Sequence, residues 1–399
     1  MSDEQSAYQK LKEAADSEGV QSAFDELAAI FESEKKYPQL FDALLMKKRN
    51  SLGLPLEGAE NLRDLPETTQ AELEEYYVTI CRRVGGLFLA DGNVQAAWPY
   101  FRAIDEPQKV AETIEKWNPP EGDDDDGEET DVVIDIALGQ GAHPTRGFEL
   151  VLSQYGVCRA VTTFEHQFPH GPEVKQKCAR LLVDRIYADL LENLLYDVKT
   201  QKGKEAEQAD IRSLVSAHPE LFEGHGYHID ISHLQSVVRF SSILEKREGL
   251  DKALQLCEYG RKIPRDFQSP DPPPFDDFYN DYRIFFQALL GTGVDGAVRY
   301  FTQKADQAEV DEDGKHFPAE VLIHLLYRVG RYEDALDQHE KYLKDYRGAL
   351  SVAPSLLELS DRMGSYERLL GIAEAREDLL QYAAALAKQA AADSSTPAG

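Results

Sequence analysis

Apolar residues recur at helical spacing along almost the whole chain of 399 residues. In one such stripe, Leu182, Ile186, Leu190 and Leu194 follow one another at intervals of four residues. Side chains three or four residues apart share one face of an α-helix, so each stripe predicts an amphipathic helix. Alternating runs of β-branched residues, the pattern of a half-buried strand, do not occur. We therefore expect an all-α fold.

Two short segments near the C-terminus repeat one pattern. They begin at Gly330 and Gly364, read GRYEDAL and GSYERLL, and have their glycines 34 residues apart. Glycine can end the first helix of a hairpin, the tyrosine can pack across the turn, and the small or apolar residue that follows lets the second helix approach closely. Looser versions begin at Gly92, Gly249 and Gly293. The pattern predicts antiparallel helical hairpins stacked in series.

In pattern and period, the C-terminal third resembles the tetratricopeptide-repeat family. The residues at family-like positions are Leu322, Leu326, Gly330, Tyr332 and Ala335. The resemblance covers two clear units and several degenerate ones. It implies a tetratricopeptide-like α-solenoid whose concave face binds a protein or peptide, and it does not imply catalysis.

Two stretches interrupt the helical pattern. Residues 119–131 concentrate carboxylates, including Asp123 to Asp126, with no apolar residue before Val132, which predicts a solvated acidic linker. Residues 264–275 are rich in proline, which removes backbone donors and favours extended geometry. The expected organisation is an N-terminal helical hairpin module at 1–118, the acidic linker, a less regular histidine-rich helical module at 132–263, the proline-rich linker, tetratricopeptide-like repeats at 276–392 and a disordered tail at 393–399.

The net charge limits the kinds of partner. The sequence has 43 Lys and Arg against 72 Asp and Glu, a formal charge of −29 at pH 7. This field repels nucleic-acid phosphates and anionic lipid, and no local basic patch offsets it. We therefore expect neither nucleic acid nor a membrane as partner.

Two further features bear on the compartment. The acidic start of the sequence, Met1 to Gln5, lacks the basic and apolar regions of a secretory signal, and no apolar run approaches the ~18 residues of a membrane span. The four cysteines, Cys81, Cys158, Cys178 and Cys257, are widely spaced, which is typical of reduced thiols. These features predict a cytoplasmic protein.

The middle module is rich in histidine, with seven of the ten histidines between residues 143 and 233. Pro144 and Pro172 are placed to begin helices, and Ser232 with Gln235 has the spacing of a capping box. The expected helices of this module are 144–155, 157–167, 172–200, 207–222 and 232–247. If they alternate in direction, the loops before 144, at 168–171 and at 223–231 emerge at one end. This topology predicts a histidine-rich rim.

Imidazole nitrogens and carboxylate oxygens are common ligands of divalent transition metals such as zinc. The candidate metal ligands are His143, His166, His170, His225, His228 and His233. Glu165 and Asp230 are candidates for a ligand or a catalytic base, and Arg146 and Arg239 for binding an anionic substrate.

Three functions follow from these features. The first is a cytoplasmic helical-repeat scaffold that binds a peptide or partner protein. The second is a metal-dependent enzyme of hydrolase or lyase type, with its site in the middle module. The third is a pH sensor that uses the histidine-rich rim. The histidine spacing matches neither HExxH nor ExxH, and polar residues are common at helix ends, so the scaffold is our leading prediction.

Overall fold

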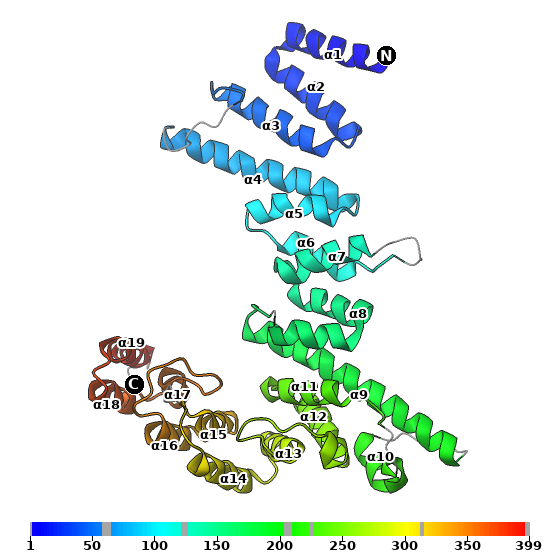
Figure 1. The fold of residues 1–399 in the computed structure, drawn as a ribbon. Helices are drawn as coiled ribbons and strands as arrows, with labels where there is room; N and C mark the ends of the chain where they lie inside the picture. Colours follow the sequence, from blue (N-terminus) through cyan, green and yellow to red (C-terminus); the bar gives the residue numbers. More distant parts are fainter. Residues whose placement is uncertain are drawn as a thin grey trace. The chain divides into compact units, whose positions relative to one another are not determined.

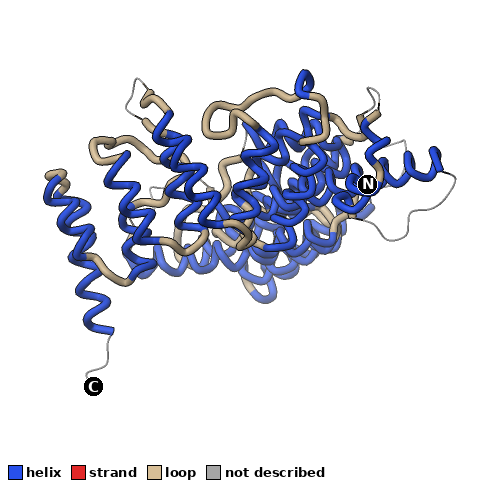
Figure 2. The backbone as a smooth tube through the Cα atoms, turned by 90° about the horizontal axis from the view of Figure 1, so that it is seen from below, coloured by secondary structure: helices blue, strands red, loops and turns tan. Residues whose placement is uncertain are grey.

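The computed structural model describes residues 2–57, 65–120, 127–166, 168–202, 210–223, 227–311 and 315–395. Over these residues the regular structure is helical and no strand is present (Figure 2). The all-α prediction is confirmed for this part of the chain. None of its helices combines the length and the apolar character that crossing a membrane requires.

The chain divides into two compact units. Unit 1 comprises Met1–Gly156 and Pro169–Val174, and unit 2 comprises Val157–Phe168 and Lys175–Gly399. The dividing point interrupts α8 (Pro144–His166), because the backbone of Gly156 has φ 77° and ψ −177° and leaves the helical region. The expected break between helices at this residue is confirmed.

The helices of unit 1 are α1 (Ser2–Glu18), α2 (Val20–Ser33), α3 (Tyr37–Ser51), α4 (Glu67–Ala90), α5 (Val94–Ala103), α6 (Gln108–Lys116), α7 (Glu128–Ile134), the π-helical turn η2 (Asp135–Gly139) and the first part of α8. Unit 2 contains the rest of α8, most of α9 (Pro172–Lys202), α10 (Ile211–Ala217), η3 (Pro219–Phe222), α11 (Ile231–Phe240), η4 (Ser241–Ile243), α12 (Arg247–Gly260), η5 (Arg265–Phe267), α13 (Phe278–Leu289), α14 (Val294–Gln307), α15 (Phe317–Arg328), α16 (Tyr332–Tyr342), α17 (Leu356–Met363), α18 (Glu367–Ala375) and α19 (Leu379–Ser395). α19 includes residues 393–395 of the predicted tail, and residues 396–399 lie outside the described residues.

Within each unit, helices pack mainly on their neighbours in the sequence (Figure 1). Each helix from α1 to α5 packs on the next, and so does each helix from α12 to α16. α17 packs on both α18 and α19. Chains of short-looped antiparallel helices produce this kind of local packing.

Many helices end in the same turn. A residue with positive φ follows the helix, and the next backbone N–H donates to the carbonyl five residues earlier, at 2.8–3.3 Å. This is the Schellman turn, in which the left-handed residue lets the chain reverse while capping the last carbonyls. The positive-φ residues of these turns are Lys35, Gly53, Gly92, Asp105, Gly291, Gly330, Gly364 and Glu377. The sequence pattern predicts helix ends at Gly92, Gly330 and Gly364, and the structure has them there. Of the looser matches, Gly249 lies inside α12, and Gly293 is the N-cap of α14, two residues after the turn at Gly291.

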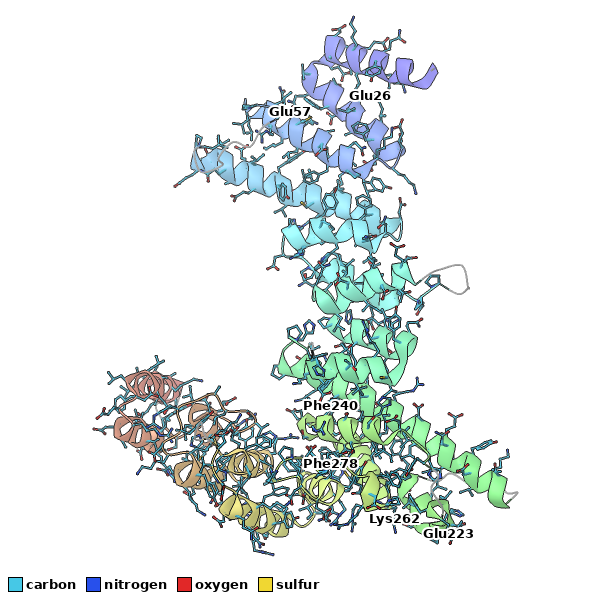
Figure 3. The ribbon with its side chains drawn as sticks, viewed as in Figure 1. Glu26, Glu57, Glu223, Phe240, Lys262 and Phe278 are labelled. Atoms are coloured by element: carbon cyan, nitrogen blue, oxygen red, sulfur yellow. The ribbon has the colours of Figure 1, made fainter. Side chains whose placement is uncertain are left out.

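The two predicted linkers do not coincide with the division between the units. After the acidic stretch, whose residues 121–126 lie outside the described residues, Val133 of α7 is buried beside Trp98 in the core of unit 1. In the proline-rich stretch, the carboxylate of Asp271 accepts two hydrogen bonds from Arg239, at 2.9 and 2.7 Å. The Arg239 guanidinium also lies 5.9 Å from the ring centroid of Phe278. Phe278 is the first residue of α13 (Figure 3). Both stretches therefore adjoin packed structure within a single unit.

The middle-module helices differ from the predicted bounds at several places. The predicted helix 207–222 is divided into α10, which ends at Ala217, and η3, which begins at Pro219. The predicted helix 232–247 ends at Phe240, where α11 gives way to η4, and a new helix begins at Arg247. The predicted capping box at Ser232 is wrong: the N-cap is Asp230, whose side chain accepts the His233 backbone N–H at 3.0 Å. Asp230 reaches this N–H because it lies three residues before it, the usual N-cap geometry.

Candidate functional site

The predicted site residues lie in both units. In unit 1, His143 Nε2 lies 2.9 Å from Glu115 Oε2. His143 Nδ1 accepts the backbone N–H of Arg146 at 3.4 Å, a contact at the first turn of α8. These contacts give His143 the role of a helix-end residue that links α6 to α8.

The other predicted residues of unit 1 also have protein partners. The Arg146 guanidinium donates to Glu149 at 2.7 Å and to the Trp117 carbonyl at 2.8 Å. His170 Nε2 lies 2.7 Å from the Leu138 carbonyl, the last turn of η2. Arg146 thus ties the end of α6 to α8, and its charge is partly balanced by Glu149.

In unit 2, Glu165 and Arg239 lie near each other. Glu165 Oε1 is 3.9 Å from Arg239 Nη1, a looser contact than the paired hydrogen bonds between Arg239 and Asp271. His166 is exposed, with Nδ1 3.3 Å from the Thr162 carbonyl of its own helix. Asp271 therefore engages Nε and Nη2 of the guanidinium that was expected to hold an anionic substrate.

His228 is the most enclosed of the predicted residues, with 8% of its surface exposed. Its Nδ1 lies 3.0 Å from the Tyr259 hydroxyl and its Nε2 3.1 Å from Asp197 Oδ2. Burial lowers the pKa of His228, and the neighbouring Asp197 opposes that shift. A neutral ring satisfies both contacts, because Nδ1 accepts the Tyr259 hydroxyl proton and Nε2–H donates to Asp197. His228 thus joins α9, the segment before α11, and α12.

Asp230 and His233 have a structural role at the start of α11. Asp230 Oδ1 accepts hydrogen bonds from the Ser232 hydroxyl at 2.6 Å and the His233 backbone N–H at 3.0 Å. The Ser232 hydrogen bond is the main reason that the pKa of Asp230 is lowered. His233 Nδ1 lies 3.9 Å from the same carboxylate oxygen. As the N-cap of α11, the Asp230 carboxylate already accepts a hydrogen bond from the backbone of that helix.

The predicted residues are therefore distributed among different local partners. Over the described residues, no group of three or more His, Cys, Asp or Glu side chains is placed to hold one metal ion. His225 lies outside the described residues. Elemental mass spectrometry of untagged protein tests the metal prediction directly. Near-stoichiometric metal that is lost in a His228→Ala/His233→Ala variant would support the metal prediction. Metal-free wild-type protein would contradict it.

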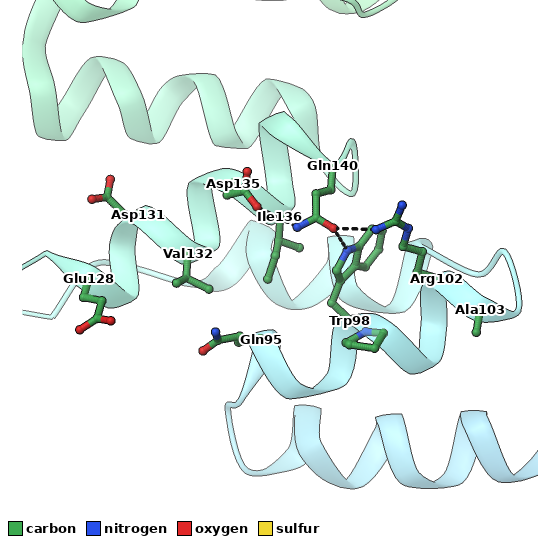
Figure 4. A pocket seen from close by; sticks show the side chains of 11 residues that line it. Gln95, Trp98, Arg102, Ala103, Glu128, Asp131, Val132, Asp135, Ile136 and Gln140 are labelled. Carbon is green, nitrogen blue, oxygen red and sulfur yellow. Dashed lines mark hydrogen bonds between the residues drawn. The ribbon is translucent and has the colours of Figure 1, made fainter. Parts of the chain in front are cut away.

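A groove in unit 1 offers a different candidate. It is flanked by α5 on one side and by α7 and η2 on the other, and has a volume of about 900 Å³ (Figure 4). Its lining residues are Gln95, Trp98, Pro99, Arg102, Ala103, Glu128, Asp131, Val132, Asp135, Ile136 and Gln140. A second hollow of about 520 Å³ shares Gln95, Glu128 and Val132 with it and extends past Asp91 and Glu129. We call the two hollows together the α5–α7 groove.

The floor of the α5–α7 groove is apolar. Pro99 and Ala103 are exposed, and Val132 is half-buried. Beneath them, Trp98 and Ile136 are buried and belong to the core of unit 1. The groove thus places accessible apolar surface next to the buried core of unit 1.

One end of the groove is held by a hydrogen-bond network around Gln140. Its Oε1 accepts the Trp98 indole N–H at 2.5 Å and an Arg102 N–H at 3.1 Å, and its Nε2 donates to Asp135 Oδ2 at 2.8 Å (Figure 4). The π-helical turn makes this possible, because the Gln140 backbone N–H donates to the Asp135 carbonyl at 2.7 Å and brings the two side chains together. A Cβ at Gly139 would lie 2.7 Å from Asp135 Oδ1, so a larger residue there would force the Asp135 side chain to shift. Single π-helical turns occur frequently at functional sites.

The wall of the groove that α7 and η2 form is acidic. Glu128, Asp131 and Asp135 are exposed and line it from α7 and η2. Asp131 accepts the Tyr155 hydroxyl at 2.8 Å and Asp135 accepts the Gln140 amide, both neutral donors. Their negative charges are therefore not cancelled by these contacts.

Close packing of α8 on η2 positions this wall. A Cβ on Gly147 would lie 2.7 Å from the Leu138 backbone nitrogen and 2.9 Å from the Ala137 Cβ. We expect Gly147→Ala to destabilise unit 1 by ~1–3 kcal/mol, because backbone atoms cannot move aside as a flexible side chain can. Chemical unfolding followed by Trp fluorescence measures this, since both tryptophans, Trp98 and Trp117, lie in unit 1.

Gly86→Ala is the matched control for that measurement. Gly86 lies inside α4 of the same unit, and a Cβ there meets nothing within 4 Å. Alanine at this position should stabilise the helix by about 0.5–1 kcal/mol. Equal effects of the two substitutions would contradict the packing argument.

The groove was missed at the sequence level because residues 119–131 were assigned to a linker. A signal was present: Glu128, Asp131, Val132 and Asp135 have the spacing of one helical face. The opposing helix α5 cannot be inferred from that spacing, since it lies more than twenty residues earlier in the chain.

Comparison with models of protein families gives no match. Neither the curated proteins nor the solved structures contain a match to this chain.

Proposed function

We propose that this chain is a helical-hairpin repeat protein, similar in construction to tetratricopeptide-repeat proteins, that binds a partner protein or peptide. The observation that carries this proposal is the α5–α7 groove, an open depression with an apolar floor and polar walls. Binding sites commonly combine apolar lining with a few placed polar groups that fix orientation. Helical scaffolds also present peptide-binding grooves between neighbouring helices.

The repeated helix-end turn supports the same proposal. Gly330 and Gly364 both have positive φ, and each lies between two helices that pack on each other. Stacked hairpins of this kind form an α-solenoid that buries a continuous core and leaves an extended surface for partners.

The composition supports a cytoplasmic setting and a protein partner. All four cysteines are free, and Cys81, Cys178 and Cys257 are buried. The charge of −29 disfavours nucleic acid and anionic membranes as ligands. The partner that we propose is therefore a peptide or a protein surface.

Peptide display on the full-length chain tests the proposal. Peptides selected from a random library should bind wild-type protein, and Gln95→Trp should weaken them about tenfold or more, because the new ring fills the point shared by both hollows. Gln9→Trp makes the same substitution at an exposed site on α1 and should leave the dissociation constant unchanged. A selection that enriches no peptide would contradict the proposal, and so would peptides that bind Gln95→Trp as tightly as wild type.

A further inference from the structure

We infer that the α5–α7 groove binds a basic segment of a partner protein, in which Lys or Arg side chains flank a bulky apolar residue. This inference rests on the proposed function and names the chemical class of the partner.

The first observation is the arrangement of carboxylates along one wall. Glu128, Asp131 and Asp135 are three and four residues apart, so they follow one face of α7 and continue into η2 (Figure 4). Glu129 and Asp91 add carboxylates along the second hollow. A ligand lying in the groove would thus meet a row of negative charges.

The second observation is that little positive charge balances this row. Over the described residues, Glu128, Glu129, Asp131 and Asp135 form no ion pair with Lys or Arg. Asp91 pairs with Lys35 at 2.8 Å, and both side chains are partly exposed. Arg102 lies at the other end, where it donates to Gln140. Electrostatic complementarity therefore favours a cationic ligand along the α7 wall.

The third observation is the apolar floor beside this wall. Val132 lies between Asp131 and Asp135 on the same face, and Pro99 and Ala103 of α5 also line the groove. A bulky apolar side chain would bury accessible surface here, which favours binding because apolar area is removed from water. The expected motif is therefore mixed, with an apolar anchor between cationic residues.

The chain's own neighbouring segment is a poor match for the groove. Residues 121–126 read EGDDDD, so their charge has the same sign as the wall. Like charges repel at short range, which favours a ligand from another chain.

Fluorescence anisotropy on the full-length protein tests the inference. The probe is a short fluorescein-labelled peptide in which Lys and Arg flank one Trp. One comparison peptide replaces every Lys and Arg with Glu, and another replaces the Trp with Gly. We expect both changes to weaken binding about tenfold or more, and raised ionic strength to weaken the basic probe as its charges are screened.

Variants locate the binding. Glu128→Lys/Glu129→Lys reverses two exposed charges of the groove and should weaken the basic probe about tenfold, with Glu128→Gln/Glu129→Gln intermediate. Glu74→Lys/Glu75→Lys makes the same charge change at exposed sites on α4 and should have little effect. Far-UV circular dichroism and thermal unfolding establish that each variant remains folded.

The outcomes separate this inference from the proposed function. Equal binding of the basic and acidic probes overturns the inference. Equal weakening by the α7 and α4 double variants overturns it too, since binding would then follow the net charge of the chain. Display-selected peptides that bind in the groove without excess Lys or Arg overturn the inference and leave the proposed function standing. A selection that enriches no peptide contradicts the proposed function itself.

Discussion

Lowering the pH from 7 to 5 should destabilise unit 2 on the order of 4 kcal/mol, about 2 kcal/mol from each of two histidines. Burial lowers the pKa of both His324 and His339 to about 4. Arg328 adds to the shift at His324, and Arg376 adds to it at His339. A hydrogen bond with the Val352 backbone opposes the shift at His324. At His339 the opposing contributions are a hydrogen bond with its own backbone and then Glu340, and burial outweighs them at both residues.

The direction follows from the protons bound in each state. In the unfolded chain these imidazoles protonate near their ordinary pKa of about 6.5. In the folded chain they stay neutral until the pH approaches 4, so the unfolded state binds more protons between these values. Their contribution to stability is therefore present above pH 6.5 and is lost as the pH falls through this window. The lowered pKa of His228 acts in the same direction.

Urea unfolding at a series of pH values measures this loss. Far-UV circular dichroism reports both units, whereas fluorescence of Trp98 and Trp117 reports unit 1. We expect the circular-dichroism transition to move further with pH than the fluorescence transition. His339→Gln keeps a polar side chain without an imidazole and should reduce the pH dependence. An unfolding midpoint that is the same at pH 7 and pH 5 would contradict the prediction.

Lys304→Met should destabilise unit 2 by ~3–5 kcal/mol, because it leaves a buried carboxylate without its cation. Asp281 is fully buried, and its Oδ2 lies 2.7 Å from Lys304 Nζ. Tyr300 and the Asp277 backbone also donate to this carboxylate, at 2.6 and 2.8 Å. Burial raises the pKa of Asp281 even though Lys304 and Tyr300 act to lower it. Without Lys304, two neutral donors would have to stabilise a charge in a site without water contact.

A double variant separates the loss of charge balance from the loss of packing. Lys304→Met/Asp281→Asn removes both charges and should recover about 2 kcal/mol relative to Lys304→Met alone. Lys341→Met is the surface control: Lys341 and Asp306 form an ion pair at 2.7 Å, but each side chain is 50% exposed, so the cost should stay below about 1 kcal/mol. Equal costs of Lys304→Met and Lys341→Met in chemical unfolding would contradict the argument from burial.

The helices themselves were largely predictable, because the signals that set them are local. Pro144 and Pro172 begin α8 and α9 as expected, and Gly156 breaks the helical backbone. The apolar spacing of an amphipathic helix can be recognised from a short stretch of neighbouring residues. The failure at Ser232 was also local: Asp230 and Ser232 are both good caps, and the sequence does not say which one the backbone selects.

The candidate sites were less predictable because they depend on which helices meet. One partner of His228 is Asp197, which lies 31 residues earlier in the chain, on α9. No local spacing in the sequence connects the two residues. The groove likewise needs α5 beside α7, and its wall needs a π-helical turn that shifts Gln140 toward Asp135. Such tertiary pairings determine whether clustered polar residues form one site or satisfy separate partners.

The Schellman turns bear on how a chain of this kind can change its length. At turns such as those at Gly330 and Gly364, the reversal is made by one left-handed residue and a backbone hydrogen bond, and it depends little on the neighbouring side chains. From α12 to α16, each helix also packs on the next one in the sequence. Duplication or loss of a whole hairpin would therefore alter only the interfaces beside it. Duplication of a hairpin can therefore lengthen such a protein, and deletion can shorten it, in steps of one hairpin without changing the remaining interfaces.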